Sequence, residues 1–126
     1  MDPQTETLLQ LSAEDEQTML LDGIPDLAFG FHAQQAVEKL LKALIAALGQ
    51  RYPRTHDLEK LAAVLELAGE SLPSFSINPA DLTRYALDYR YGEPLSNQSL
   101  RREQAIATVR ILRAFVHGRI AAIDSR

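Results

Sequence analysis

The sequence predicts an all-α fold, a single-domain up-and-down bundle of four to five helices. Several long segments repeat apolar residues at helical spacing, and no segment alternates over a useful length with the period of a strand. Glycines and prolines separate these segments. With 126 residues and 46% hydrophobic content, the chain is long enough for one domain, residues 1–126, around one core.

The composition narrows the class of protein before any motif is considered. Without cysteine, disulfides and thiolate chemistry are excluded. A net charge of −4 differs from that of a globally basic protein that binds long duplex nucleic acid, although the last third is locally rich in arginine. The N-terminus has neither the basic region nor the apolar segment of a signal peptide, and no apolar run reaches membrane length. We therefore expect a cytoplasmic protein without membrane contact.

The first element is expected to begin only after residue 11. Residues 1–11 have no firm periodicity and are expected to be loosely ordered, which leaves a packed core of about residues 12–124. Ser12 precedes acidic residues and is the expected N-cap of a helix over about 13–22. Gly23 is expected to end this helix.

The second helix is expected over about residues 25–48, with Pro25 in its first turn and Gly49 after its end. Its interior Gly30 suggests a close contact with another helix. One side of this helix is apolar: Ala33, Ala36, Val37, Leu40, Leu41, Leu44 and Leu48. The opposite side is polar and contains His32, Gln35, Lys39 and Lys42. Gln34 and Glu38 lie at the edge of the apolar side. On periodicity alone, this polar side is interpreted as the solvated face of an amphipathic helix.

Two shorter helices follow. Thr55 is the expected cap of the third, which continues the core through Leu58, Leu61, Leu65 and Ala68 until Gly69. A loop over 71–78 leads to Asn78-Pro79, which predicts the start of a fourth helix that ends near residues 91–92.

The fifth helix is expected to begin at a cap formed by Ser96 or Asn97 and to reach Asp124. Its predicted apolar side contains Ala105, Val109, Leu112, Val116, Ile120 and Ile123. Arg110, Arg113 and His117 are expected to project together beside this apolar side.

The motifs of several common enzyme classes are missing from the sequence. The three histidines have no metal-binding spacing, so no metal site is predicted. There is neither a phosphate-binding glycine loop nor a serine nucleophile elbow, and no cofactor is predicted.

Arg110 and His117 are the best candidates for chemistry. They are seven residues apart, about two helical turns, so they project from one side. Cleaving a phosphodiester without metal requires a proton carrier, a role for histidine, and a fixed positive charge on the phosphorane oxygens, a role for Arg110 or Arg113. Arginine and histidine also share helices by chance, so a structural interpretation stays open.

Other polar residues have simpler interpretations. His56 and Asp57 are interpreted as structural, with Asp57 complementing the helix dipole. Tyr85 and Tyr89 are interpreted as core residues, although aromatic rings can stack on bases.

Three segments together resemble the HEPN domain family, in the branch with an F-H-x-Q-Q-A-x-E-K motif. These segments are residues 31–43, residues 52–58 and residues 85–91. The resemblance implies a helical bundle that forms a homodimer and acts with a minimal nucleotidyltransferase in toxin–antitoxin-like pairs. It also implies, for many members, metal-independent endoribonuclease activity from an arginine and a histidine at a cleft between two protomers.

The resemblance leaves two functions open for this chain. In the first, the protein is a nucleotide- or RNA-related accessory or toxin-like component with little or no catalysis, in which His32, Gln35, Lys39 and Arg90 bind a ligand or organise a partner. In the second, it is a ribonuclease that uses Arg110 and His117. The resemblance further suggests that two residues at the edge of the apolar side, Gln34 and Glu38, make buried polar contacts with Tyr89 or Arg90.

Overall fold

The computed structural model describes residues 1–91 and 101–126, with side chains for 1–86 and 101–126. This part of the chain contains five helices and no strand, which confirms the all-α prediction. The helices are α1 (Pro3–Met19), α2 (Asp26–Ala47), α3 (Leu58–Leu67), α4 (Pro79–Tyr91) and α5 (Arg102–Asp124). None of the described helices is long and apolar enough to cross a membrane.

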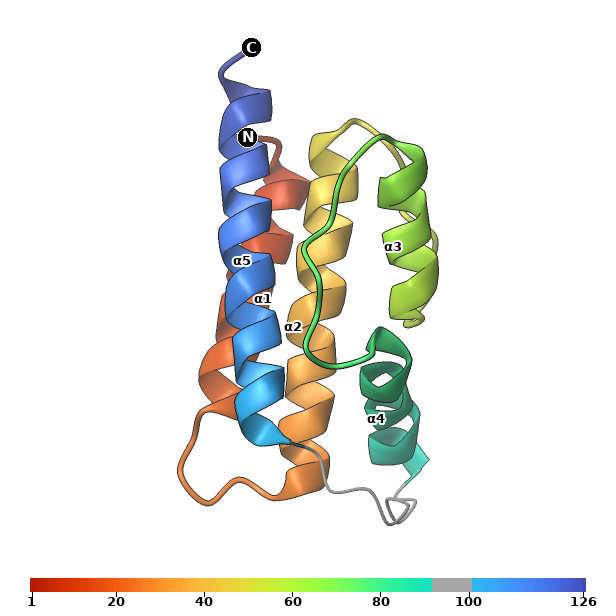
Figure 1. Ribbon diagram of the computed structural model, residues 1–126. Coiled ribbons are helices and arrows are strands. Elements are labelled where there is room, and N and C mark those ends of the chain that lie inside the picture. The colour runs from red at the N-terminus through yellow and green to blue at the C-terminus, as the bar shows by residue number, and fades with distance from the viewer. Residues whose placement is uncertain (92–100) are drawn as a thin grey trace.

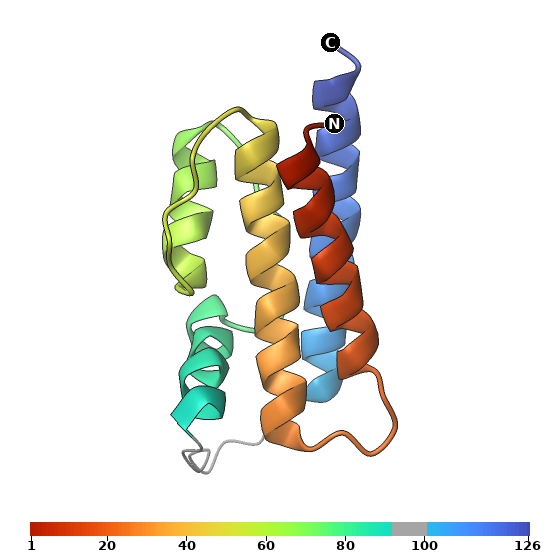
Figure 2. The same cartoon turned by 180° about the vertical axis from the view of Figure 1, so that it is seen from behind.

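The central element is α2, which packs against every other helix. In Figure 1, α1 and α5 lie on one side of α2, while α3 and α4 are stacked end to end on the other. The helices do not alternate strictly in direction. Because residues 48–57 return along the bundle before α3 begins, α2 and α3 run the same way, and α5 runs parallel to both (Figures 1 and 2).

The core follows the predicted apolar side of α2. Every residue of that side is buried except Leu48, which packs against the core from its edge. The predicted core residues of α3 and α5 are likewise buried, with Ala68 and Ile123 only partly so. Gly30 confirms the expected close contact, because a Cβ atom there would lie 2.2 Å from Cδ1 of Tyr85. The ring of Tyr85 thus sets how closely α4 approaches α2.

The prediction for the first helix was wrong at both ends. The helix α1 begins at Pro3, ten residues before the expected start (13 − 3), and Asp2 caps it by accepting hydrogen bonds from the N–H groups of Gln4 and Thr5. Residues 3–11 are therefore helical rather than loosely ordered. Ser12 lies buried inside the helix and donates its Oγ hydrogen to the carbonyl oxygen of Ala36 at 2.9 Å. The first part of this helix has no clear apolar period in the sequence, because polar residues occupy much of its buried side: Thr5, Ser12, Asp15 and Glu16.

Two other predicted caps were also wrong. The cap of α3 is Asp57, whose Oδ1 accepts from the N–H groups of Glu59 and Lys60. Thr55 instead accepts a hydrogen bond from the N–H of Asp57, which forms the turn before the helix. Arg101 occupies the cap position of α5, and the proposed caps at positions 96 and 97 lie outside the described residues.

Candidate functional site

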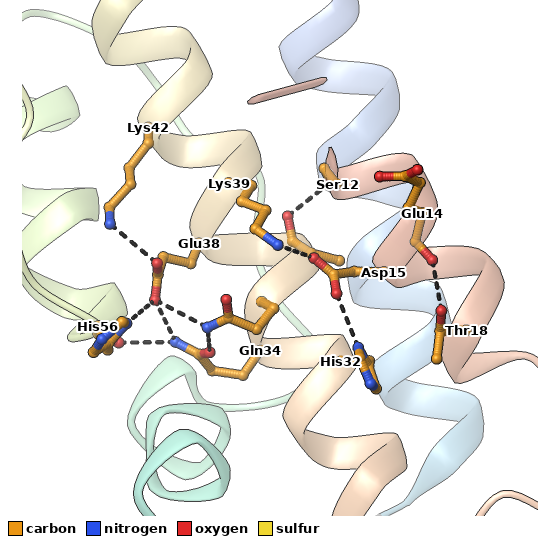
Figure 3. Close-up of polar contacts among 12 residues, drawn as sticks. Ser12, Glu14, Asp15, Thr18, His32, Gln34, Glu38, Lys39, Lys42 and His56 are labelled. Carbon is orange, nitrogen blue, oxygen red and sulfur yellow. Dashed lines mark hydrogen bonds and ion pairs between the residues drawn. The ribbon is translucent and has the colours of Figure 1, made fainter. Parts of the chain in front are cut away.

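Polar side chains of α2 form two networks, one on each flank of the helix (Figure 3). The first, which we call the Asp15 network, joins α2 to α1. The buried carboxylate of Asp15 lies between two residues of α2 that are two turns apart. Its Oδ1 is 2.9 Å from Nδ1 of His32, and its Oδ2 accepts a hydrogen bond from Nζ of Lys39. A single carboxylate therefore satisfies two cationic or polar groups and fixes the register of α1 on α2.

The second network, which we call the Glu38 network, joins α2 to the segment before α3. Only 4% of Glu38 is exposed. Its Oε1 accepts from Nε2 of Gln34 at 3.1 Å and lies 2.8 Å from Nδ1 of His56, while its Oε2 accepts from Nζ of Lys42 at 3.0 Å. Lys42 also lies over the ring of Tyr52, 5.3 Å from its centroid. These contacts hold residues 52–56 against the middle of α2.

The contacts of the Glu38 network control the ionisation of the Glu38 carboxyl group. Burial alone raises the pKa of Glu38, but hydrogen bonds from Gln34, His56 and Lys42 together outweigh burial and hold the pKa below its ordinary value of 4.5. Glu38 is therefore a carboxylate at neutral pH. Because a carboxylate can only accept, Nδ1 of His56 carries the proton that the two groups share.

Gln34 completes this network with its side-chain amide. It is fully buried, and its Nε2 also donates to the backbone oxygen of His56 at 2.9 Å. Its Oε1 accepts from Nε2 of Gln35 at 2.7 Å. Among the described residues, no buried side-chain nitrogen or oxygen lacks a hydrogen-bond partner. The polar interior is thus fully satisfied, as a stable buried network must be.

The predicted ligand-binding residues of α2 already have partners within the chain. His32 and Lys39 contact Asp15, and Gln35 donates to Gln34. All three are half-buried, so the interpretation of this side of α2 as a solvated face was wrong. The fourth predicted residue, Arg90, lies outside the described side chains, as does Tyr89. The described partners of Gln34 and Glu38 are residues of α2 and of the segment before α3, while their predicted contacts with Tyr89 or Arg90 fall outside the described side chains.

The three candidate residues for chemistry are divided between two environments on α5. Arg113 forms an ion pair with the buried carboxylate of Glu16 on α1, with Nη1 and Oε2 2.5 Å apart. Arg110 and His117 are exposed, and no ion pair joins either of them to another described residue. The structure thus leaves Arg110 and His117 accessible on one face of α5, whereas Arg113 stabilises the contact between α1 and α5.

Sequence reasoning missed the carboxylates that organise these contacts. Asp15 was interpreted as a first-turn acid and Glu16 was given no role, yet both are buried and paired. Glu70, which is 9% exposed, accepts two hydrogen bonds from Arg119 at 2.7 and 3.0 Å and ties the segment after α3 to α5. The spacing of the two acids on α1 could have indicated their burial, because Ser12, Asp15, Glu16 and Met19 fall on one side of a helix. Across the described ranges, no three metal-ligating side chains gather into a metal site.

These features define an all-helical bundle whose long central helix carries buried polar networks on both flanks. The model of the HEPN domain family matches residues 18–119, and the chain belongs to this family. Membership gives the chain a nucleotide- or RNA-related function in general terms. Searches of curated proteins and of solved structures found no match to the chain.

Proposed function

We propose that the chain is a HEPN-type accessory or toxin-like component that acts on RNA together with a minimal nucleotidyltransferase, and that it contacts RNA through α5. The observation that supports this surface is the pair Arg110 and His117, which is exposed and makes no ion pair with the described residues. Arginine and histidine donors are suited to phosphate oxygens.

The lysines of α2 are less suited to binding phosphate than Arg110 is. Asp15 compensates the charge of Lys39, and Glu38 compensates that of Lys42. A phosphate that displaced either carboxylate would leave a buried anion without its partner, which is costly. Arg110 incurs no such cost, so the open face of α5 is the better phosphate contact.

A specific observation on α5 supports a homodimer. Gly118 lies inside the helix and is exposed, and a Cβ atom built there would meet nothing within 4 Å. An interior glycine costs about 1 kcal/mol relative to alanine, so a position with free space favours alanine unless another backbone approaches closely. Ala114 and Ala121, one turn away on either side, are also small and exposed. A second copy that packs here would lie beside Arg110 and His117.

The accessibility of Arg110 and His117 also favours metal-independent cleavage of RNA as a second candidate function. In this mechanism His117 moves the proton of the 2′-hydroxyl or of the leaving group, and Arg110 stabilises the charge of the phosphorane. Arg113 is the alternative phosphate contact, but it would first have to leave Glu16.

RNA binding tests the proposed surface directly. Anisotropy of a labelled single-stranded RNA should show weaker binding for Arg110→Ala than for the wild type. The matched control is Arg126→Ala, which removes another exposed arginine, beyond the end of α5, and should bind as the wild type does. Equal affinity of all three proteins would contradict the proposal. If Lys39→Ala instead abolished nucleotide binding in calorimetry, the ligand site would lie on α2.

Cleavage is tested separately, by incubating RNA with the protein in EDTA. The ribonuclease function predicts cleavage by the wild type and a loss of about 100-fold or more in His117→Ala. Binding without cleavage would leave the accessory function and reject the ribonuclease. For the partner, co-expression with a minimal nucleotidyltransferase encoded by an adjacent gene should give one complex in size-exclusion chromatography, and separate elution would contradict that part of the proposal.

A further inference from the structure

A second surface, on α3 and not on α5, has the features of a docking site. The outer side of α3 and the segment that connects it to α4 border an open hollow of about 400 Å³. In Figure 1 this segment leaves the end of α3 and crosses in front of α2 on its way to α4. None of the residues that form the hollow takes part in the networks of α2 or in the α5 pair.

The floor of the hollow exists because the side chains of α3 are small at this point. Ala62 and Ala63 lie between two larger residues of the same helix, Glu59 and Glu66. The opposite wall is formed by residues 72–75 and is mostly apolar, with Leu72, Pro73 and Phe75 beside the polar Ser74. Leu72 and Phe75 pack against the core from outside, so the wall is anchored.

The charges of the hollow have one sign. Glu59 and Glu66 are exposed, and neither forms an ion pair with another described residue. They are seven residues apart on one side of α3, which corresponds to about 10 Å along the helix. The residues that line the hollow include no cation. A hollow with an apolar part between two uncompensated carboxylates complements a segment with an apolar side chain between two cations.

We propose that this hollow binds a basic amphipathic segment of a partner protein, with an apolar side chain over Ala62 and Ala63 and a lysine or arginine at each carboxylate. A helical segment matches the spacing, because residues seven apart on a helix are also separated by about 10 Å. Leu67 extends the apolar contact at the end of α3, since 90% of it is exposed. This binding does not require the RNA function proposed for α5.

The test uses the whole chain labelled with ¹⁵N and synthetic helical peptides as probes. The first peptide carries two lysines seven residues apart with leucines between them, and the matched peptide carries glutamates in place of the lysines. We expect the lysine peptide to shift the amide signals of residues 59–66, of Leu72 and of residues 74–78, and the glutamate peptide to leave them unchanged. Binding should weaken as salt is raised, because the carboxylates are exposed.

Two variants and one control complete the experiment. The double variant Glu59→Lys/Glu66→Lys should weaken binding by about tenfold or more, and Ala63→Lys should do the same by filling the hollow and adding a like charge. Glu14→Lys makes the charge change of one of the two glutamate substitutions at an exposed position on α1 and should bind as the wild type does.

Three results would overturn the proposal. One is equal shifts with the lysine and glutamate peptides. Another is the absence of shifts with either peptide at about 1 mM, a concentration that detects even weak binding. The third is a shift of these same signals on raising the protein concentration alone, which would assign the hollow to a second copy of the chain. Failure of RNA binding by α5 would not bear on any of them.

Discussion

Two helix-interior glycines show how differently the same residue is used in this chain. Gly30 has no room for a side chain, because the ring of Tyr85 occupies the space where a Cβ atom would be. Gly118 has free space around it within the described part of the chain. Close packing therefore explains the first glycine, whereas nothing within the chain's own described contacts explains the second.

The two glycines predict opposite effects of alanine. Gly30→Ala should lower the free energy of unfolding by about 1–3 kcal/mol or more, because α2 and α4 must move apart. Gly118→Ala should raise the stability of the isolated protomer by about 1 kcal/mol. Chemical denaturation of both variants at low protein concentration measures the two effects, and a destabilising Gly118→Ala would show that the protomer itself requires this glycine.

Glu38 predicts how stability depends on pH. Its pKa is held below 4.5 in the folded protein, so the unfolded chain binds a proton more readily as the pH falls. The stability that its contacts provide is therefore complete above pH 4.5 and is lost as the pH falls through the lower, folded-state pKa. Glu38→Gln should lower stability at neutral pH and flatten this acid dependence.

Urea unfolding at a series of pH values checks this prediction. Glu14→Gln is the control, since it alters an exposed carboxyl group and should keep the wild-type slope. The same slope in Glu38→Gln and the wild type would show that other carboxyl groups, such as Asp15 or Glu16, dominate the acid dependence.

At the scale of elements, α1 shows that a helix can pack through a largely polar side. Its Thr5 and Ser12 are buried like its Leu9, and its Asp15 and Glu16 are paired with cations of α2 and α5. Hydrogen bonds and ion pairs thus provide much of the contact that apolar side chains provide elsewhere in the bundle.

Two leucines in the first part of α1 test whether this segment is packed. Leu9 is 8% exposed and Leu11 is 40% exposed. Leu9→Ala should cost about 2–5 kcal/mol, as for other buried leucines, whereas Leu11→Ala should change stability by no more than about 0.5 kcal/mol. Thermal or chemical denaturation compares the two, and equal, negligible effects would mean that residues 1–11 are loose in solution.

At the scale of the molecule, the polar networks that hold the bundle together and the exposed polar pair lie on different helices. The flanks of α2 hold α1 and the segment before α3 through the Asp15 and Glu38 networks, while α5 presents Arg110 and His117 outward. The proposed RNA contact and the proposed docking hollow therefore lie on different elements, α5 and α3. Variants on one should leave the other intact.

The proposed homodimer predicts a stability that depends on concentration. The melting temperature should rise with protein concentration, because association stabilises only the folded chain. Gly118→Leu should remove this dependence and give a monomer in sedimentation equilibrium. Ala13→Leu, which enlarges an exposed residue of α1, is the control. A wild-type protein that sediments as a monomer at all concentrations would contradict the homodimer.

The sequence by itself determined the helices where local signals were strong. The second helix was predicted over 25–48 and lies over 26–47, and the predicted start of α4 at Asn78-Pro79 is confirmed. Two of the glycines expected to end helices, Gly49 and Gly69, have positive φ and directly follow the C-caps of α2 and α3, whereas α1 ends at Met19, before Gly23. These features depend on apolar spacing and on backbone preferences of single residues, which a sequence displays directly.

Only the tertiary structure decided which polar groups meet. The first half of α1 was missed because its buried side lacks an apolar period, and His32 and Lys39 were separated from their partner Asp15 by the turn between two helices. A carboxylate that pairs across helices leaves no local pattern, since its partner depends on how the two helices pack. The same packing determined that Arg113 is engaged with Glu16 while Arg110 and His117 stay exposed, although all three belong to one helix and share its periodicity.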